Sequence, residues 1–217
     1  MATPATESKS PGRLLRVVAV AIVALALGVW FGMERSPRKP IETVAATVLN
    51  PPQPLADFTL ADHLGRPFSK ASFAGKWTFL FFGYTHCPDV CPTTLSALAQ
   101  INRALDEQAA DNPPRQVVFV SVDPSRDTAA SLAKYVAYFN PRFLGVTGEL
   151  PAIETLTRQL GILHIRAENQ DGGGYLIDHS ASVLLVGPDA ALRAIFSAPH
   201  TQESMVRDFL AISAAYS

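Results

Sequence analysis

The sequence predicts an α/β domain, in which a central mixed β-sheet is flanked by helices, preceded by an N-terminal membrane anchor. Two observations indicate this class. An apolar run of strand length, WTFLFFG at residues 77–83, is followed by apolar residues at helical spacing over residues 93–108. Strand-like and helix-like segments then continue to alternate, as in parallel sheets whose strands are joined by helices. With 217 residues, the chain has room for one such domain and an appendage.

Composition excludes two broad classes of protein. The formal net charge is -1 and charged residues make up 17% of the chain, with no basic stretch dense enough to bind nucleic acid. The chain has only two cysteines, four positions apart, which excludes a scaffold held together by disulfides. We therefore expect a globular, non-nucleic-acid-binding protein whose cysteines serve chemistry rather than architecture.

The first element along the chain is expected to be a transmembrane helix over residues 17–33, after a short tail over residues 1–16. The run is uncharged and, at about 1.5 Å per residue, reaches roughly 25 Å. A cleaved signal peptide is the alternative, because Arg13 and Arg16 suit its basic region, but the run is long and lacks a close cleavage site. An anchor followed by a long domain predicts that the domain lies on the non-cytoplasmic side, the periplasm in a bacterium, where disulfides form. Proline-rich residues 34–54 are expected to be an extended linker.

The domain is expected over residues 55–217, beginning with a hairpin that turns at residues 62–66. The strand at residues 77–83 is apolar throughout, which is typical of a central strand buried on both faces. The other expected strands are 116–122, 143–146, 162–167, 175–177, 182–186 and 192–196, and the expected helices are 93–108, 128–139, 152–160 and 203–216. Parallel strands, then an antiparallel hairpin and a helix, with two cysteines at the first strand-to-helix junction, are the thioredoxin-like arrangement.

The cysteine pair, Cys87 and Cys91, lies in GYTHCPDVCPTT. Pro92 suits the first position of a helix, which leaves Cys91 near the N-cap and Cys87 in the preceding loop. Because the N-terminus of a helix favours thiolate over thiol, we expect both cysteines to be acidic and nucleophilic. Two neighbouring thiols form either a redox-active disulfide or two ligands for a soft metal ion, Cu(I) or zinc.

His179, in YLIDHSASVLLVG, is the best candidate for a third metal ligand. It follows an expected strand, in a loop that faces the cysteines in a thioredoxin-like fold. Oxidoreductases of this fold have a cis-proline there, but residues 178–181 contain none. An ordinary hydrogen-bonded histidine is the structural alternative, and His86, next to Cys87, is the rival ligand. The remaining histidines are interpreted as surface or core residues: His63, His164 and His200.

The segments GYTHCPDVCPTTL, VSVDPSRDT and YLIDHSASVLLVGPDA together resemble the Sco/SenC family of cytochrome oxidase assembly proteins over roughly residues 55–216. The resemblance implies that Cys87, Cys91 and His179 bind copper, as Cu(I), Cu(II) or both. It also implies delivery of copper to the dinuclear copper centre of cytochrome c oxidase subunit II, or reduction of that subunit's cysteines. Other copper chaperones or thiol–disulfide oxidoreductases are further partners in this interpretation.

Two functions therefore remain open, a copper metallochaperone and a thiol–disulfide oxidoreductase. A peroxidase is disfavoured, because the threonine-before-cysteine pattern of peroxiredoxins is not reproduced: His86 precedes Cys87, and Thr85 is one position further back. Among the acidic residues near the motifs, Asp123 is interpreted as a turn former, and Asp127 or Thr128 as a helix cap. The alternative for these aspartates is a role in supporting the site or docking a partner. Asp178 either orients the neighbouring imidazole or points away from it.

Overall fold

The computed structural model describes residues 11–34, 41–108, 112–168 and 175–216, and the chain divides into two compact units, residues 1–40 and 41–217. The first unit contains helix α1 (Pro11–Glu34), which includes the whole of the expected apolar run. By the hydropathy of the residues that the structure describes, no helix is long and apolar enough to span a bilayer.

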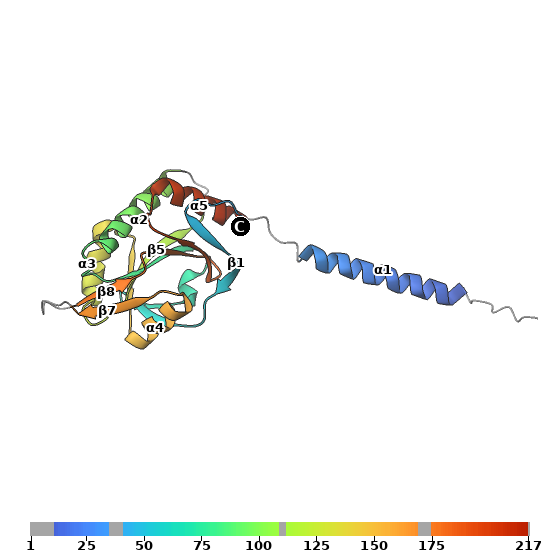
Figure 1. Cartoon of the computed structure of the whole chain (residues 1–217), viewed down its shortest axis with the longest axis horizontal. Coiled ribbons are helices and arrows are strands. Elements are labelled where there is room, and N and C mark those ends of the chain that lie inside the picture. Colours follow the sequence, from blue (N-terminus) through green and yellow to red (C-terminus); the bar gives the residue numbers. More distant parts are fainter. Residues whose placement is uncertain (1–10, 35–40, 109–111, 169–174, 217) are drawn as a thin grey trace, which may run out of the picture. The chain divides into compact units, whose positions relative to one another are not determined.

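The second unit is built on an eight-stranded mixed sheet in the order β1-β10-β9-β4-β5-β6-β2-β3. Two of these strands, β1 and β5, are labelled in Figure 1. Its strands are β1 (Ala46–Pro54), β2 (Thr59–Asp62), β3 (Pro67–Ser69), β4 (Trp77–Gly83), β5 (Arg115–Ser121), β6 (Leu144–Thr147), β9 (Val183–Val186) and β10 (Ala191–Phe196). The helices are η1 (Lys70–Phe73, a 3₁₀ turn), α2 (Val90–Glu107), α3 (Ala129–Phe139), α4 (Leu150–Gln159) and α5 (Gln202–Ala215). The predicted α/β class is confirmed, and the strand at residues 77–83 has the predicted bounds.

Strand β4 lies in the middle of the sheet, parallel to β5 and antiparallel to β9. Its alternate side chains enter two separate cores. Phe79 and Phe81 pack with the apolar residues of α2, α3 and α5, whereas Leu80 and Phe82 pack on the opposite face with those of α4 and the β2–β3 hairpin. The continuous apolar pattern of this strand follows from burial on both faces.

The parallel pairing of β4 with β5 brings the loops that follow these strands to the same edge of the sheet. Gly83, the last residue of β4, is paired with Ser121, the last residue of β5. The cysteine loop follows the first strand, and the DPSRDT segment follows the second. This edge is therefore where the candidate site is built.

The domain begins before residue 55, because residues 46–54, expected within the linker, form strand β1 and pair with β10. A buried carboxylate fixes the start of this strand. Asp208 of α5 accepts hydrogen bonds from the backbone N–H groups of Val44, Ala45 and Ala46, at distances between 2.7 and 3.1 Å. β1 tolerates its prolines because it is an edge strand, paired on one side only, and its register shifts between Val48 and Gln53.

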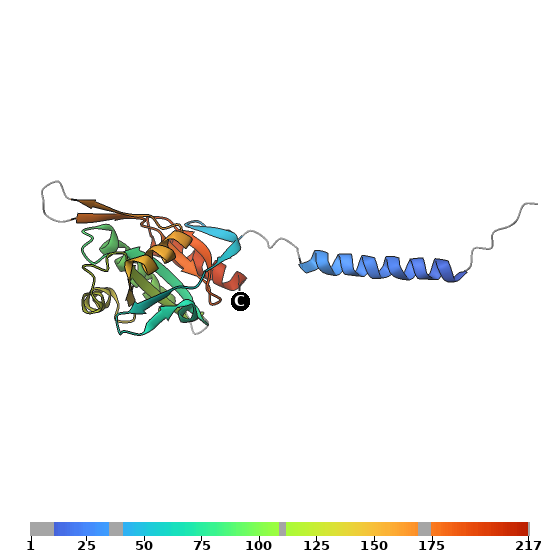
Figure 2. The ribbon, with the colours of Figure 1, turned by 90° about the horizontal axis from the view of Figure 1, so that it is seen from below.

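Strands β7 (His164–Glu168) and β8 (Tyr175–His179) form a separate two-stranded antiparallel sheet, which we call the β7–β8 hairpin. In Figure 2 the two strands, in orange-brown, run side by side along one side of the domain. The backbone of His179 is paired with that of His164, and Ile177 of β8 is buried in the core. His179, the expected third ligand, is thus the last residue of β8.

Candidate functional site

The cysteine loop, residues 84–89, connects the end of β4 to the start of α2. Helix α2 begins at Val90 with Asp89 as its N-cap, so Cys91 is the second helical residue and not the cap. The predicted start at Pro92 is wrong by two residues. Proline fits the first helical turn because the N–H groups there have no partner within the helix, and Pro92 occupies the third position of that turn as readily as the first.

The two thiols differ in accessibility. Cys91 is fully buried in the core beneath α2, whereas Cys87 is partly buried and contacts both cores. Both cysteines are reduced, and the Cys91 N–H group donates a hydrogen bond to Cys87 Sγ at 3.4 Å. One sulfur therefore faces the surface, and the second lies behind it.

Gly83 makes room for the buried sulfur. A Cβ atom at position 83 would lie 2.6 Å from Cys91 Sγ and 2.8 Å from the Phe119 ring. Real Cβ atoms do not approach other atoms so closely, and the flanking strand and aromatic ring leave little space for a shift. Gly83 is therefore required by packing, and not by an unusual backbone conformation.

The expectation of two acidic thiols is wrong for Cys91. Its thiol is hydrogen-bonded to Cys87 and removed from water, and these two effects raise the pKa of Cys91 well above its ordinary value. A backbone hydrogen bond at Tyr84 acts in the opposite direction and does not compensate. In the metal-free, reduced protein Cys91 is thus a protonated thiol at neutral pH, despite its place at a helix N-terminus.

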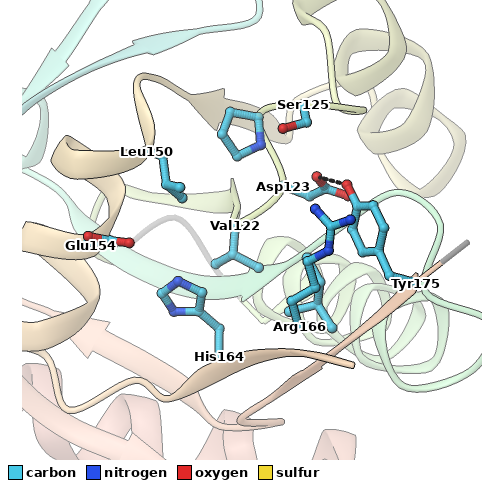
Figure 3. A pocket seen from close by; sticks show the side chains of 10 residues that line it. Val122, Asp123, Ser125, Leu150, Glu154, His164, Arg166 and Tyr175 are labelled. Atoms are coloured by element: carbon cyan, nitrogen blue, oxygen red, sulfur yellow. Dashed lines mark hydrogen bonds between the residues drawn. The ribbon is translucent and has the colours of Figure 1, made fainter. Parts of the chain in front are cut away.

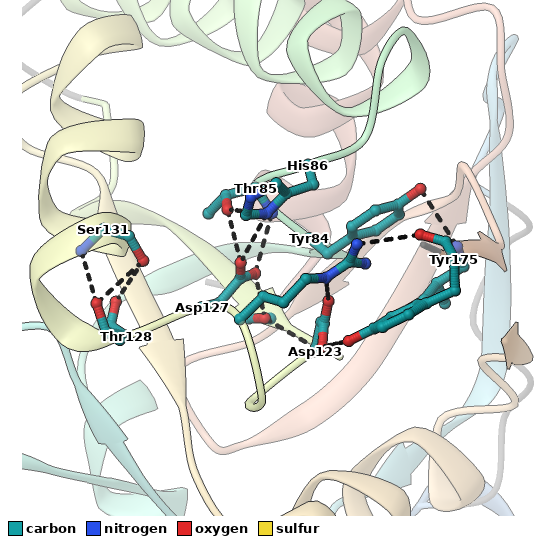
Figure 4. A network of polar contacts seen from close by, with 11 residues as sticks. Tyr84, Thr85, His86, Asp123, Asp127, Thr128, Ser131 and Tyr175 are labelled. Carbon is teal, nitrogen blue, oxygen red and sulfur yellow. Dashed lines mark hydrogen bonds and ion pairs between the residues drawn. The ribbon is translucent and has the colours of Figure 1, made fainter. Parts of the chain in front are cut away.

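Asp127 holds the cysteine loop from below (Figure 4). Its side chain is buried and accepts hydrogen bonds from the backbone N–H of Thr85 at 3.0 Å, from Thr85 Oγ1 at 2.6 Å and from Ser121 Oγ at 2.6 Å. The cap of α3 is Thr128, whose side chain accepts a hydrogen bond from the backbone N–H of Ser131. Of the two predicted caps, Thr128 is confirmed, and Asp127 instead supports the cysteine loop.

His86, the rival ligand, is directed to this carboxylate. Its Nδ1 atom lies 3.1 Å from Thr85 Oγ1 and 3.8 Å from Asp127 Oδ1, and its side chain is 56% exposed. Among the described side chains, no three His, Cys, Asp or Glu residues are grouped closely enough to hold a metal ion.

A second polar cluster joins the DPSRDT segment to the β7–β8 hairpin, as Figure 4 shows for Asp123 and Tyr175. Asp123 is 3% exposed, accepts a hydrogen bond from Tyr175 Oη at 2.8 Å and forms an ion pair with Arg126. The Arg126 guanidinium lies over the Tyr175 ring, 3.7 Å from its centroid, and donates a hydrogen bond to the Tyr175 carbonyl at 3.0 Å. Tyr84, in the cysteine loop, accepts a hydrogen bond through its hydroxyl from the Ile177 N–H at 3.2 Å.

The side chain of His179 lies outside the part of the chain that the structure describes, so its assignment as a ligand remains a prediction. The surroundings of three other histidines are described by the structure. His63 Nδ1 accepts a hydrogen bond from the Gly145 N–H, and His200 Nε2 lies 2.8 Å from the Ala181 carbonyl.

His164 lines a cavity of about 240 Å³ beside the hairpin. Figure 3 shows His164 with Glu154 at one end of this cavity and Asp123 with Tyr175 at the other.

Reasoning from the sequence missed several residues that build this site: Gly83, Arg126 and Tyr175. For Asp127 the preferred interpretation was a helix cap, and the structure instead favours the alternative, a role in supporting the site. The sequence did contain a signal for these contacts. The cysteine segment and DPSRDT follow two strands that pair in parallel, so the loops after these strands must meet at the same sheet edge. Asp178, by contrast, is exposed on β8 and paired with Ile165.

The fold and the site define a thioredoxin-like protein with a reduced dithiol at the start of a helix. The chain belongs to the SCO1/SenC family, whose profile matches residues 48–213. It is 34% identical over 201 residues to the mitochondrial SCO2 homologue of Bos taurus, which covers 92% of this chain and 75% of the bovine protein. The mouse, human and zebrafish SCO2 homologues are matched over 62%, 56% and 47% of their lengths.

Copper is bound in several of the similar solved structures. Copper-bound ScoI of Arabidopsis thaliana has a TM-score of 0.68 and 32% identity, covering 73% of this chain and 98% of that one. Copper-bound ScoI of Bradyrhizobium japonicum has a TM-score of 0.63 and 34% identity, covering 71% of this chain and 96% of that one. These similarities agree with the fold and with the family resemblance of the three motifs.

Proposed function

We propose that this protein is a copper metallochaperone that binds the ion through Cys87, Cys91 and His179. The observation that carries the proposal is the pair of sulfurs at the start of α2, with their side chains hydrogen-bonded to each other and one of them partly accessible. Two thiolates suit Cu(I), and an imidazole added to them suits either oxidation state. The copper-bound ScoI structures, similar over about three quarters of the chain, support the same assignment.

The proton on Cys91 and the partial accessibility of Cys87 suit a protein that binds a copper ion and passes it on. Copper would displace the proton that Cys91 retains in the free protein, so that binding releases protons to solvent. The ion would enter and leave past Cys87, because Cys91 is fully buried. We propose that the recipient is the dinuclear copper centre of cytochrome c oxidase subunit II, as the resemblance to oxidase assembly proteins implies.

The test is a titration of the full-length chain, purified in detergent, with Cu(I) and Cu(II). The reduced protein should bind one ion and the oxidised protein none, because a disulfide removes two ligands. His179→Ala should weaken binding by more than about a hundredfold, since even partners that only orient a metal ligand contribute about 10- to 100-fold. His164→Ala, at the paired position of the neighbouring strand, is the matched control and should leave affinity unchanged.

Each outcome decides one part of the proposal. A reduced wild-type protein that binds neither ion would exclude the chaperone. If copper binding survives His179→Ala unchanged but is lost in Cys87→Ser, the dithiol is correct and the third ligand is wrong.

A second function, a thiol–disulfide oxidoreductase that reduces client cysteines, is favoured by the unequal burial of the two thiols. The accessible Cys87 thiolate would attack a client disulfide, forming a mixed disulfide and releasing one client thiolate. Cys91, after losing its proton, would attack the Cys87 sulfur, forming the intramolecular disulfide and releasing the second client thiolate. Two electrons pass to the client, and a dithiol protein would have to restore the reduced pair.

The Cys91→Ser variant distinguishes this activity, because it prevents the second step. An oxidised peptide carrying the two copper-binding cysteines of an oxidase subunit II should then remain attached to Cys87 as a mixed disulfide, visible as an added mass under non-reducing conditions. The matched variant Cys87→Ser should trap no peptide, since its remaining thiol is buried. Equal trapping by both variants would contradict the proposed order of attack.

We also propose that α1 anchors the protein in a membrane, with the domain on the non-cytoplasmic side. The support is the uncharged run between Arg16 and Glu34 within a continuous helix. In cell membranes the full chain should resist extraction at alkaline pH, and a protease added to the non-cytoplasmic side should digest the domain. Release into the soluble fraction would contradict the anchor.

A further inference from the structure

The β7–β8 hairpin, which ends in the proposed ligand His179, is fixed in the domain by little strand pairing or packing. Its strands pair with each other and with no strand of the eight-stranded sheet among the described residues. Isolated two-stranded sheets are marginally stable in water. The cavity of about 240 Å³ between Leu150 and Glu154 of α4 and His164 and Arg166 of β7 also leaves the hairpin incompletely packed. Specific contacts must therefore hold it beside the cysteine loop.

Arg126 supplies the most extensive of these contacts. From the loop between β5 and α3, its guanidinium is paired with Asp123, donates a hydrogen bond to the Tyr175 carbonyl and lies 3.7 Å from the centroid of the Tyr175 ring. The same group lies 5.4 Å from the centroid of the Tyr84 ring, in the cysteine loop. A planar guanidinium combines charge, directed donors and a stacking face in this way, whereas a lysine ammonium does not.

These contacts reach β8 shortly before His179. Arg126 holds Tyr175, and the Tyr84 hydroxyl accepts the hydrogen bond from the Ile177 N–H, two residues before His179. After His179, the carbonyl of Ala181 lies 2.8 Å from His200 Nε2. The backbone of His179 is thus held on both sides, and on the upstream side the contacts connect it directly to the cysteine loop.

We infer that Arg126 is a positioning residue for copper binding, which fixes the hairpin so that His179 meets the two cysteines. The inference rests on the proposed function, in which His179 is a ligand. Without Arg126 the hairpin would sample more positions, and the entropy lost on binding copper would rise. The cysteine loop would keep its support from Asp127 through Thr85.

The experiment compares Arg126→Met with Arg166→Met in the full-length protein. Arg166 is the matched control, because its guanidinium lies 3.5 Å from the centroid of the same Tyr175 ring. It belongs to β7, however, and is paired with Glu168 of the hairpin itself. Arg126→Met should weaken Cu(II) affinity by about 10- to 100-fold. It should also reduce the nitrogen coupling in the electron paramagnetic resonance spectrum, a readout that general destabilisation does not change. Arg166→Met should leave both unchanged.

A double-mutant cycle then decides whether Arg126 acts through His179. In the His179→Ala background, Arg126→Met should cause no further loss of copper affinity, because the ligand that it positions is gone. Independent losses that add in the double variant would overturn the inference, as would equal effects of Arg126→Met and Arg166→Met.

Hydrogen exchange separates failure of this inference from failure of the proposed function. Arg126→Met should accelerate amide exchange in residues 175–179 of the metal-free protein, and Arg166→Met should not. If the wild-type protein binds no copper, the chaperone is excluded and exchange still reports whether Arg126 holds the hairpin. Unchanged exchange in Arg126→Met would overturn the inference whether or not copper binds.

Discussion

The cysteine loop and the β7–β8 hairpin supply the two halves of the proposed copper site, and they are held in different ways. The loop joins the central strand β4 to α2, its Cys91 is fully buried, and the buried Asp127 accepts three hydrogen bonds beneath it. The hairpin is a sheet of its own, with Ile165 63% and Leu176 41% exposed. The first half is part of the core, and the second is attached to it by one buried side chain, Ile177, and a few polar contacts.

Because the two halves are held differently, the geometry of the dithiol does not depend on the position of the hairpin. Segments with few buried apolar contacts open locally at a lower free energy than core strands. The dithiol can therefore keep its geometry, and its capacity to form a disulfide, while the hairpin moves. A ligand on the less stable half would allow an ion to be released by local opening, without unfolding of the half that carries the two sulfurs.

The largest effect is expected from Asp127→Ala, which removes the support of the cysteine loop. Two donors of Thr85 and one of Ser121, all buried or partly buried, would lose their acceptor. Because each lost hydrogen bond costs about 1 kcal/mol or more, the free energy of unfolding should fall by roughly 3 kcal/mol. Urea unfolding of the reduced protein, followed by fluorescence, measures this change.

Asp178→Ala is the control for the hairpin, since this carboxylate is exposed on β8. Its effect on unfolding should stay within about 0.5 kcal/mol, as for most surface substitutions. If Asp127→Ala and Asp178→Ala lowered the free energy of unfolding equally, the cysteine loop would not be more firmly held than the hairpin.

Gly83→Ala should have the next largest effect, because the new methyl group would lie 2.6 Å from Cys91 Sγ. Overpacking of this kind costs about 1–3 kcal/mol. In the double variant with Cys91→Ala the sulfur is absent, so part of this loss should be recovered, and unfolding of all four proteins gives the coupling energy. Strict additivity would mean that Phe119, and not the sulfur, limits the space at position 83.

Local pattern was sufficient to predict most elements of the fold. The strand at residues 77–83 was predicted to the residue, because a run buried on both faces has no polar interruption. Strand β1 was missed because Pro51, Pro52 and Pro54 suggested a linker, and only its edge position, with pairing to β10 alone, makes these prolines acceptable. An edge position is a property of the whole sheet and is not encoded in the segment itself.

The candidate site could be predicted only where one short segment carries it. Cys87 and Cys91 were found from their motif, but Arg126 and Tyr175 lie 49 positions apart and meet only through tertiary structure. The pKa of Cys91 was expected to be low from the helix N-terminus, a local feature. The hydrogen bond to Cys87 and burial, which only the fold provides, act in the opposite direction and prevail.

The smallest effect is expected from Tyr175→Phe, which removes only the hydrogen bond from the Tyr175 hydroxyl to Asp123, 2.8 Å long, and keeps the ring under Arg126. A single hydrogen bond of this kind contributes about 1 kcal/mol. If the hairpin opens as a unit of its own, this loss should increase amide exchange in residues 175–179 about fivefold and leave the urea midpoint of the domain unchanged. Tyr138→Phe, at a tyrosine that is 86% exposed, should change neither quantity. A fall in the midpoint with Tyr175→Phe, without faster exchange in the hairpin, would mean that the hairpin unfolds together with the cysteine loop and that the two halves are one cooperative unit.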